Sequence, residues 1–425
     1  MLFRSYRKDG KAWRLLLDQE ESIGLAGTTA DEGAIIAIGK IGGGESRAWL
    51  LPLDGSAPRP WNTSRSDEVT EILYDAQTGR PAGVQYGGIG EPVEWIDATT
   101  KQRMAALEKT FGDRKVNALA TSDDGKRVVV AVGDASHPTV YYLVDFARHA
   151  ADIIGEAYPE LADVATGEVR TIEYAARDGA RVPAYLTMPA TGGEKSLPVV
   201  VMPHGGPESR DSHTFDWWTQ FLASRGYAVL QPQYRGSTGF GDAWRRAGYH
   251  GWGGVMQDDV SDGVRYLVEQ GIADPARVCI VGASYGGYAA LAGAAFTPEL
   301  YACAASINGV ADLPMMLGRE KNDSGKESGA FAYWSEHIGS IHEERVRNAS
   351  PARFADRVRA PVLLIHGRDD TVVPIAQSER MDEALRAAGK PVRFVELDGE
   401  DHWLSRGATR LSMLKELEGF LAQNL

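Results

Sequence analysis

The stretch that decides the fold is Arg277-Val278-Cys279-Ile280-Val281-Gly282-Ala283-Ser284-Tyr285-Gly286-Gly287-Tyr288. An apolar run leads into a serine flanked by glycines, and an alanine-rich segment, 289–295, follows. This order predicts a strand, a tight turn and a helix with Ser284 at the apex. The Gly-x-Ser-x-Gly spacing is typical of a nucleophile elbow, because small residues let strand and helix approach closely and expose the hydroxyl. Ser284 is therefore the candidate nucleophile, and the following helix offers free N–H groups to an oxyanion.

Length and composition limit the class of protein. A chain of 425 residues is expected to form two domains. Its formal net charge of -13 argues against nucleic acid or an anionic membrane as partner, since both favour a basic face. We see no signal peptide and no apolar run of membrane-spanning length, which predicts a cytoplasmic protein. A signal peptide upstream of Met1 would instead make it periplasmic.

The two cysteines, Cys279 and Cys303, both lie in apolar runs that are typical of buried strands. We predict that they are reduced core thiols.

Residues 1–165 are predicted to form an all-β domain, because short β-type runs alternate there with turn residues. The runs are Trp13–Leu17, Ala34–Ile38, Ala48–Leu53, Glu71–Tyr74, Pro81–Tyr86, Val128–Val132 and Thr139–Asp145. Asp124-Gly125 is a hairpin turn signal ahead of the last two runs. Such hairpins are typical of β-propeller blades, and an irregular β-sandwich is the alternative. Within this region 99–109 is expected to be helical or a loop, and 150–167 to be a linker.

Residues 166–425 show a different pattern. A hairpin is predicted over 169–174 and 182–188, and apolar strands then alternate with amphipathic helices. The expected strands after the hairpin are 198–202, 228–232, the elbow strand, 303–307, 362–366 and 392–397, and the expected helices include 217–224, 255–270, 375–388 and 409–422. This alternation indicates an α/β domain whose mostly parallel sheet is covered by helices on both faces. The polar segment 312–360 breaks the pattern and is expected to be a helical excursion near the site.

A nucleophilic serine needs a base, and the base needs an orienting carboxylate. In an α/β-hydrolase sheet these groups follow the serine along the chain, on loops after later strands. His402 comes directly after the strand 392–397 and is the only histidine beyond residue 366. Asp369 and Asp370 both follow the strand 362–366, and spacing alone does not separate them.

The oxyanion needs a second N–H donor besides the residue after the serine. Pro203-His204-Gly205-Gly206-Pro207 follows a predicted strand and could supply it, with a plain glycine turn as the alternative. His204 and His366 lie at strand ends, but no H-x-x-x-H or C-x-x-C spacing accompanies them. We therefore expect neither a metal nor a cofactor.

Seven motifs in order resemble the prolyl oligopeptidase family of serine peptidases, and its acylaminoacyl-peptidase-like branch in particular. They are 203–207 (PHGGP), 234–241 (YRGSTGFG), 252–259 (WGGVMQDD), 282–288 (GASYGGY), 350–351 (SP), 366–374 (HGRDDTVVP) and 399–402 (GEDH). The resemblance covers residues 168–425. It implies an α/β-hydrolase domain that cleaves short peptides, joined to a β-propeller that screens substrates by size.

The resemblance also implies roles for single residues. The family pattern H-G-x-x-D-x-x-V-P selects Asp370 as the orienting carboxylate, and Gly206 and Tyr285 correspond to the N–H donors of the oxyanion hole. The positions expected at the substrate are His204, Val372, Val373 and Trp403. His204 stands where prolyl oligopeptidase has a tyrosine hydroxyl, and Val372 stands where relatives commonly have Arg or Asn. These two departures argue against proline specificity and leave room for ester substrates.

About 165 residues suffice for three or four propeller blades, which cannot close a ring of seven or eight. Open blades expose strand edges, so we expect either a longer parent protein or a homo-oligomer that covers them. The predicted function is a serine hydrolase that cleaves short peptides or acyl-peptides through an acyl-enzyme. The alternatives are a carboxylesterase with the same triad and a non-catalytic binding module on the same fold.

Overall fold

The structure is a computed structural model that describes residues 3–9, 12–19, 21, 23–61 and 63–425. It divides into two compact units. The β unit comprises Met1–Ala165 with the short segments Ser212–Asp216 and Thr238–Ala243, and the α/β unit comprises the rest of the chain from Thr166. No helix among the described residues is both long and apolar enough to cross a membrane.

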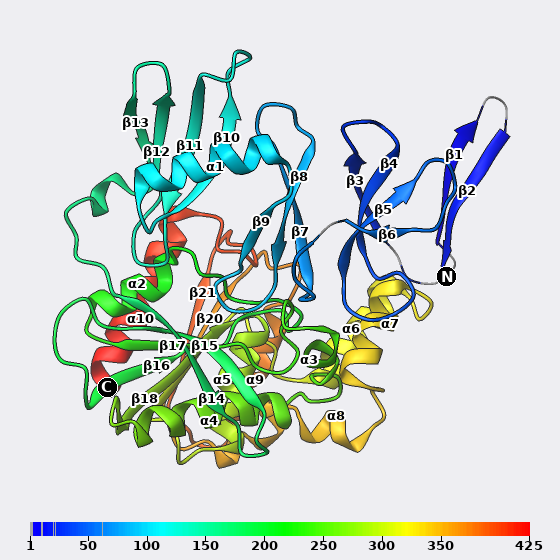
Figure 1. Ribbon diagram of the computed structural model, residues 1–425. Helices are drawn as coiled ribbons and strands as arrows, with labels where there is room; N and C mark the ends of the chain where they lie inside the picture. Colours follow the sequence, from blue (N-terminus) through cyan, green and yellow to red (C-terminus); the bar gives the residue numbers. More distant parts are fainter. Residues whose placement is uncertain (1–2, 10–11, 20, 22, 62) are drawn as a thin grey trace. The chain divides into compact units, whose positions relative to one another are not determined.

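The described part of the β unit forms four small antiparallel sheets, shown in Figure 1. Their strands are β1 (Phe3–Asp9) and β2 (Ala12–Gln19); β3 (Ile23–Thr28), β4 (Ala34–Gly39), β5 (Arg47–Pro52) and β6 (Arg59–Pro60); β7 (Val69–Tyr74), β8 (Pro81–Tyr86) and β9 (Val93–Trp95); and β10 (Lys115–Thr121), β11 (Arg127–Gly133), β12 (Val140–Asp145) and β13 (Ala150–Glu156). Asp124-Gly125 does lie in the turn between β10 and β11, and Gly125 has the positive φ of 68° that this turn needs.

The β unit has separate small cores. In β11 every second side chain is fully buried, namely Val128, Val130 and Val132, as expected for a strand with one buried face. These valines pack against Met104 and Leu107 of helix α1 (Ala98–Phe111), so the segment 99–109, predicted to be helical or a loop, is helical. A second cluster joins the sheet of β3–β6 to that of β7–β9. Stacked sheets that each bury one face are the arrangement of propeller blades.

The prediction of a linker over 150–167 was wrong for its first half, because Ala150–Glu156 forms β13, which pairs with β12. The reason is that β13 lies at the edge of its sheet and is mostly exposed; Ile153 and Ile154 are 59% and 55% exposed. An edge strand that buries little shows no clear alternation of apolar and polar residues.

The α/β unit is built on one eight-stranded sheet in the order β14-β15-β17-β16-β18-β19-β20-β21. β15 is antiparallel to both of its neighbours, and the other neighbouring pairs are parallel. The strands are β14 (Val169–Ala175), β15 (Arg181–Thr187), β16 (Leu197–Val201), β17 (Ala228–Pro232), β18 (Ala273–Ala283), β19 (Cys303–Ile307), β20 (Val362–Gly367) and β21 (Val392–Leu397). The hairpin and the strand positions predicted after residue 166 are thereby confirmed.

Helices cover both faces of this sheet (Figure 1). One face packs against α4 (Val255–Glu269), α5 (Tyr285–Phe296) and α9 (Ala376–Ala387), and the other against α2 (Trp217–Ser224) and α10 (Gly407–Asn424). The segment expected as a helical excursion forms α6 (Leu313–Ser324), α7 (Gly329–Ile338), α8 (Glu344–Asn348) and the 3-10 helix Pro351–Arg357; the short α3 (Asp242–Arg246) and the 3-10 helix Pro159–Leu161 complete the set among the described residues.

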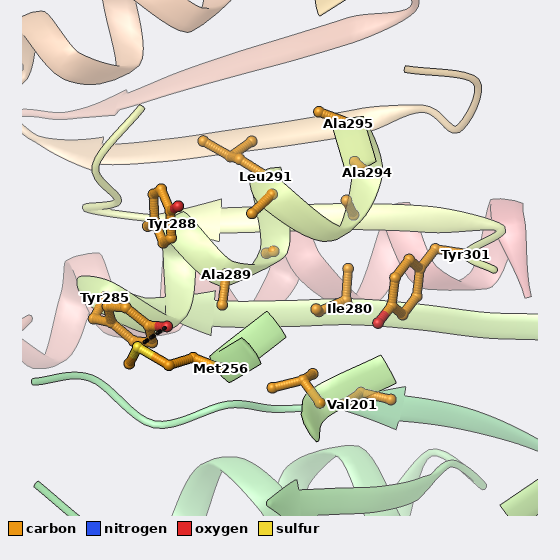
Figure 2. Close-up of a cluster of buried hydrophobic side chains, with 14 of the residues drawn as sticks. Val201, Met256, Ile280, Tyr285, Tyr288, Ala289, Leu291, Ala294, Ala295 and Tyr301 are labelled. Atoms are coloured by element: carbon orange, nitrogen blue, oxygen red, sulfur yellow. Dashed lines mark hydrogen bonds between the residues drawn. The ribbon is translucent and has the colours of Figure 1, made fainter. Parts of the chain in front are cut away.

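Helix α5 is almost entirely buried, which explains its sequence. Its residues from Tyr285 to Ala295 are all buried, so an apolar surface on every side replaces the usual single stripe. Figure 2 shows α5 between neighbouring elements, with Tyr285 pointing at Met256 of α4. Alanine and glycine keep the helix thin enough to lie against the strands closely.

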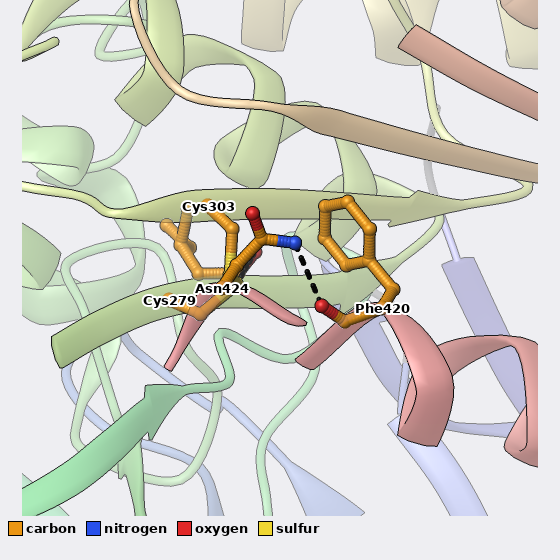
Figure 3. The surroundings of a disulfide bond; sticks show 5 residues. Cys279, Cys303, Phe420 and Asn424 are labelled. Atoms are coloured by element: carbon orange, nitrogen blue, oxygen red, sulfur yellow. Dashed lines mark hydrogen bonds between the residues drawn. A yellow bond between two sulfur atoms is a disulfide. The ribbon is translucent and has the colours of Figure 1, made fainter. Parts of the chain in front are cut away.

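The expectation of two reduced core thiols was wrong: the structure joins Cys279 and Cys303 in a disulfide (Figure 3). The two residues are direct partners in the parallel pair β18 and β19, and their Cα atoms are 4.7 Å apart. Both side chains are fully buried. The register that places them opposite one another comes from the assembled sheet, and the sequence alone did not reveal it.

Helix α4 touches the sheet at a glycine, and this contact gives a stability prediction. A Cβ at Gly263 would lie 2.8 Å from Leu230 Cδ2 and from the Tyr174 ring. We expect Gly263→Ala to lower the free energy of unfolding by about 1–2 kcal/mol, because overpacking outweighs the gain in helix propensity. Urea unfolding measures the change.

The matched control is Gly419→Ala in α10, where an added Cβ would meet nothing within 4 Å. It should raise the free energy of unfolding by about 0.5–1 kcal/mol through propensity alone. Shifts of the same sign in both variants would contradict the packing explanation.

Candidate active site

Ser284 lies at the sharp turn between β18 and α5. Its backbone has φ 59° and ψ -121°, a region that L-residues rarely adopt, so the turn is strained. The Ser284 N–H donates to the carbonyl of Ile307 at the end of β19, at 3.0 Å. This geometry is that of a nucleophile elbow, in which the hydroxyl is held clear of the helix that it begins.

Glycines around Ser284 are required by close backbone packing. A Cβ at Gly282 would run into the backbone of Gly286, and a Cβ at Gly286 would run into the carbonyl of Pro203. Strand, helix and the Pro203-to-Pro207 turn therefore meet backbone to backbone. Side chains at either position would force these three elements apart.

His402 and Asp370 lie side by side. The Nδ1–H of His402 donates to Asp370 Oδ2 at 2.6 Å, and the two side chains are 9% and 0% exposed. The other carboxylate oxygen, Oδ1, accepts from the backbone N–H groups of Val372 and Val373, each at 2.8 Å. Asp369, the competing candidate, is exposed. Geometry thus favours Asp370 as the partner of the histidine.

The surroundings of Asp370 keep it ionised. Burial alone raises the pKa of this carboxyl, but its interactions with His366 and His402 outweigh burial and lower the pKa to about 2. His366 is itself fixed, because its Nε2–H donates to the carbonyl of Val373 at 2.8 Å and the Ser378 hydroxyl donates to its Nδ1 at 2.7 Å. His366 therefore supports the aspartate and is not a second base.

Asn308 ties three loops together directly after β19. Its amide NH₂ donates to the carbonyls of Asp401 and His402 at 3.2 and 3.1 Å, and its amide oxygen accepts from the N–H of Gly367 at 2.8 Å. The side chain is almost fully buried, and its backbone has φ 48°. Asn308 thereby holds the loop of His402 against the ends of β19 and β20.

Among the described residues, no hydrogen bond links the Ser284 hydroxyl to His402. The histidine–aspartate contact is formed, and the serine–histidine contact is not. Such contacts are often long in enzymes without substrate and shorten when it binds.

Two backbone N–H groups could bind an oxyanion. Tyr285 is the first residue of α5, where the helix itself provides no acceptor for the N–H. Gly206, with φ 122°, donates its N–H to no acceptor within the described residues. Both residues line the same cavity as Ser284. The pair predicted from the sequence is thus brought together.

The turn that carries Gly206 is anchored by Glu208. This carboxylate pairs with Arg245 and lies 2.9 Å from Nε2 of His337 on α7. Burial raises the pKa of Glu208, but its interactions with His337 and Arg245 outweigh burial and lower the pKa to about 2. The turn is thus held by a charged side chain two residues after Gly206.

His204 does not reach the cavity. Its ring stacks on Tyr234, with centroids 4.3 Å apart, and its Nδ1–H donates to the carbonyl of Gly205 at 2.7 Å. Its Nε2 lies 2.8 Å from the hydroxyl of Ser237. Burial lowers the pKa of His204 to about 4, so the ring is neutral near pH 7. The expected substrate contact of His204 is therefore replaced by a structural role in the turn.

The cavity beside Ser284 has a volume of about 300 Å³. Val372 and Val373, both predicted at the substrate, line it, whereas Trp403 does not. Trp403 is 69% exposed and stands edge-on to the His402 ring, with centroids 5.6 Å apart. The remaining lining residues are Gly206, Trp252, Ser284, Tyr285, Val310, Met316, Arg319, Glu320, Asp323, Ser324, Trp334, Thr371 and Pro374.

Sequence reasoning missed Asn308 and the cavity face of α6. Asn308 directly follows a predicted strand, as the other site residues do, and that position was an available signal. Met316, Arg319, Glu320 and Asp323 have the i, i+3, i+4, i+7 spacing of one helix face, but nothing in the sequence says what this face covers. Within the described residues, no group of three or more His, Cys, Asp or Glu side chains could hold a metal ion.

Known proteins are similar to this chain in sequence and in fold. The model of the prolyl oligopeptidase family matches residues 213–425, and the model described as Esterase FrsA-like matches residues 94–314. Dipeptidyl aminopeptidase BIII of Pseudoxanthomonas mexicana is 31% identical over 403 residues, which are 90% of this chain and 57% of that protein. This chain thus spans little more than half the length of that relative.

Solved structures of other proteins have a similar fold. A puromycin-hydrolyzing peptidase of Mycobacterium tuberculosis is 28% identical with a TM-score of 0.79, over 98% of this chain and 64% of that one. The acylaminoacyl peptidase of Pyrococcus horikoshii, 21% identical, has a TM-score of 0.74 over 100% of this chain and 66% of that one, which is a likeness of fold. The predicted fold class, an α/β-hydrolase domain preceded by propeller-type sheets, is confirmed. With a family model that spans half of its residues and a matching fold, this chain belongs to the prolyl oligopeptidase family.

Proposed function

We propose that this chain is a serine peptidase in which Ser284 is the nucleophile, His402 the general base and Asp370 the orienting carboxylate. The observation that carries the proposal is the 2.6 Å hydrogen bond from His402 Nδ1 to a buried, ionised Asp370, in the unit that holds Ser284 on a strained turn. This bond keeps a proton on Nδ1 and leaves the lone pair of Nε2 to act as the base.

In the first half of the proposed reaction, the Ser284 oxygen attacks the substrate carbonyl while His402 Nε2 takes the hydroxyl proton. The carbonyl oxygen becomes an oxyanion and accepts hydrogen bonds from the N–H groups of Tyr285 and Gly206. The tetrahedral species then collapses, and the imidazolium returns its proton to the leaving amine. An acyl-enzyme on Ser284 remains.

In the second half, His402 takes a proton from water, and the hydroxide attacks the acyl-enzyme. Collapse of this second tetrahedral species returns the proton to Ser284 and releases the acid. Ionised Asp370 stabilises the imidazolium in both halves. Because its pKa is about 2, it carries its charge throughout the neutral range.

Relatives support peptides as the substrate class. Similar proteins bear the names dipeptidyl aminopeptidase, acylamino-acid-releasing enzyme and puromycin-hydrolyzing peptidase. Each of these names describes an enzyme that cleaves an amide bond. We infer that this chain cleaves amide bonds of short peptides or acyl-peptides.

The nucleophile assignment is tested with Ser284→Ala. We expect kcat on a peptide p-nitroanilide to fall by about 10⁴-fold or more, because the reaction loses its covalent step. A fluorophosphonate probe should label the wild-type protein on Ser284 and should not label the variant. Peptide turnover that persists in the variant, or labelling at another serine, would refute the assignment.

A carboxylesterase is the second candidate, favoured by the match of residues 94–314 to the Esterase FrsA-like model. Amide cleavage requires His402 to protonate a poor leaving group, whereas ester cleavage requires this less. We expect kcat/KM to be measurable for both an ester and an anilide of the same acyl group. Turnover of the ester alone would assign the chain as an esterase.

Asp370 should make stability depend on pH. Its folded-state pKa of about 2 lies below the unfolded value of about 3.9, so its stabilisation is complete above pH 4 and is lost as the pH falls toward 2. The shift corresponds to about 3 kcal/mol. Urea unfolding of the wild type and Asp370→Asn should therefore differ most at pH 7, with the difference shrinking below pH 4.

The control for the pH experiment is Asp369→Asn, which removes an exposed carboxylate from the same turn. Its free energy of unfolding should follow that of the wild type at every pH. A constant difference between wild type and Asp370→Asn from pH 7 to pH 3 would contradict the ion-pair account.

A further inference from the structure

Among the described residues, one residue that lines the Ser284 cavity carries a carboxylate oxygen without a hydrogen-bond partner. Oε1 of Glu320 is buried, and no hydrogen bond or ion pair to it exists within the described residues. Glu320 lies on α6 and lines the cavity together with Ser284 and Tyr285. Burying an unpaired carboxylate oxygen is costly, and a cation or donor from outside the chain would offset the cost.

The position of Glu320 on α6 explains why this residue lines the cavity. Met316, Arg319, Glu320 and Asp323 follow one another at the spacing of one helix face, and all four line the cavity. Leu313 and Leu317 lie on the adjoining side of α6 and are buried in the core, so Glu320 stands at the border between the core side and the cavity side. The buried leucines thus fix the rotation of the helix and place Glu320 among the residues that line the cavity.

The other charges on this face cancel. Arg319 Nε lies 2.9 Å from Asp323 Oδ2, one helical turn away, so these two side chains form a pair of their own. Glu320 remains as the uncompensated charge among the lining residues. A site of this kind favours a positive group, and exclusion of water would strengthen the attraction.

We propose that Glu320 is a specificity residue that binds a cationic group of the substrate, an ammonium or a guanidinium. The proposal rests on the proposed function and deepens it. Because Glu320 shares the cavity with the nucleophile, the cation must be carried close to the carbonyl that Ser284 attacks. Two sources have this chemistry: the side chain of a lysine or arginine residue, and a free amino terminus.

The cavity walls suit a cation at the end of an apolar stem. Trp252 and Trp334 line the cavity with Val310, so methylene groups would lie against indole and aliphatic surfaces. A cation near an indole face gains further attraction. The carboxylate of Glu320 would then form a charge-assisted hydrogen bond with the head of the substrate side chain.

The test compares three p-nitroanilides: N-acetyl-lysine, N-acetyl-norleucine and norleucine with a free amine. The ratio of kcat/KM for acetyl-lysine over acetyl-norleucine reports side-chain recognition, and the ratio for free over acetylated norleucine reports recognition of the amino terminus. We expect the wild type to favour one of the cationic substrates. In Glu320→Gln that ratio should fall by about 10- to 100-fold.

The matched control is Glu327→Gln, which removes a carboxylate that is 88% exposed, outside the cavity lining. Both ratios should stay at their wild-type values in this variant. Unchanged ratios in Glu320→Gln, or equal falls in both variants, would overturn the proposal.

A binding experiment separates failure of this proposal from failure of the proposed function. Isothermal titration of benzamidine and of n-butylammonium into the Ser284→Ala protein needs no catalysis. We expect one site, with affinity at least tenfold weaker in Ser284→Ala/Glu320→Gln. If the wild type cleaves no peptide but binds these cations through Glu320, the proposed function fails and the cation site stands. If neither cation binds and no ratio depends on Glu320, the cation site is refuted.

Discussion

The end of β19 is the point on which the rest of the site depends. Ile307 accepts the N–H of Ser284, and Asn308 binds both the Gly367 N–H and the carbonyls of the His402 loop. Three loops that are far apart in sequence are thereby joined at two consecutive residues. Because these bonds are buried, breaking any one would leave unpaired polar groups, and the loops move little relative to one another.

The charges of Asp370 and Glu208 depend on the positions of the loops around them. Asp370 is buried and would favour its neutral form alone, but two histidines and two backbone N–H groups surround it. It keeps its charge only while the loops that carry these donors stay in place. The same holds for Glu208, whose pairing with Arg245 and His337 anchors the turn before it. Each charged anchor therefore couples the position of a reacting group to the packing of its loop.

The sequence predicted the α/β unit well because its buried strands are short apolar runs with clear boundaries and because the Ser284 elbow needs glycines at fixed positions. It selected Ser284 and His402 from their places after strands, and it needed a family pattern to separate Asp370 from Asp369. Strand β13 was not predicted, because its exposed residues show no alternation of apolar and polar side chains. The disulfide between Cys279 and Cys303 was not predicted either. Sheet register and the cavity-facing side of α6 arise only when distant segments assemble, so local patterns do not contain them.

The helical segment that interrupts the α/β alternation and the ends of the sheet strands contribute different residues to the site. Helix α6 buries Leu313 and Leu317 in the core, and an adjoining side of the helix lines the Ser284 cavity. The proposed nucleophile and base instead follow strands β18 and β21, and Ile307 and Asn308 at the end of β19 bind their loops. Side chains on the cavity face of α6 can therefore change without disturbing those bonds. We therefore expect the reacting groups to be fixed by the sheet and the choice of substrate to depend on the cavity side of the inserted helix.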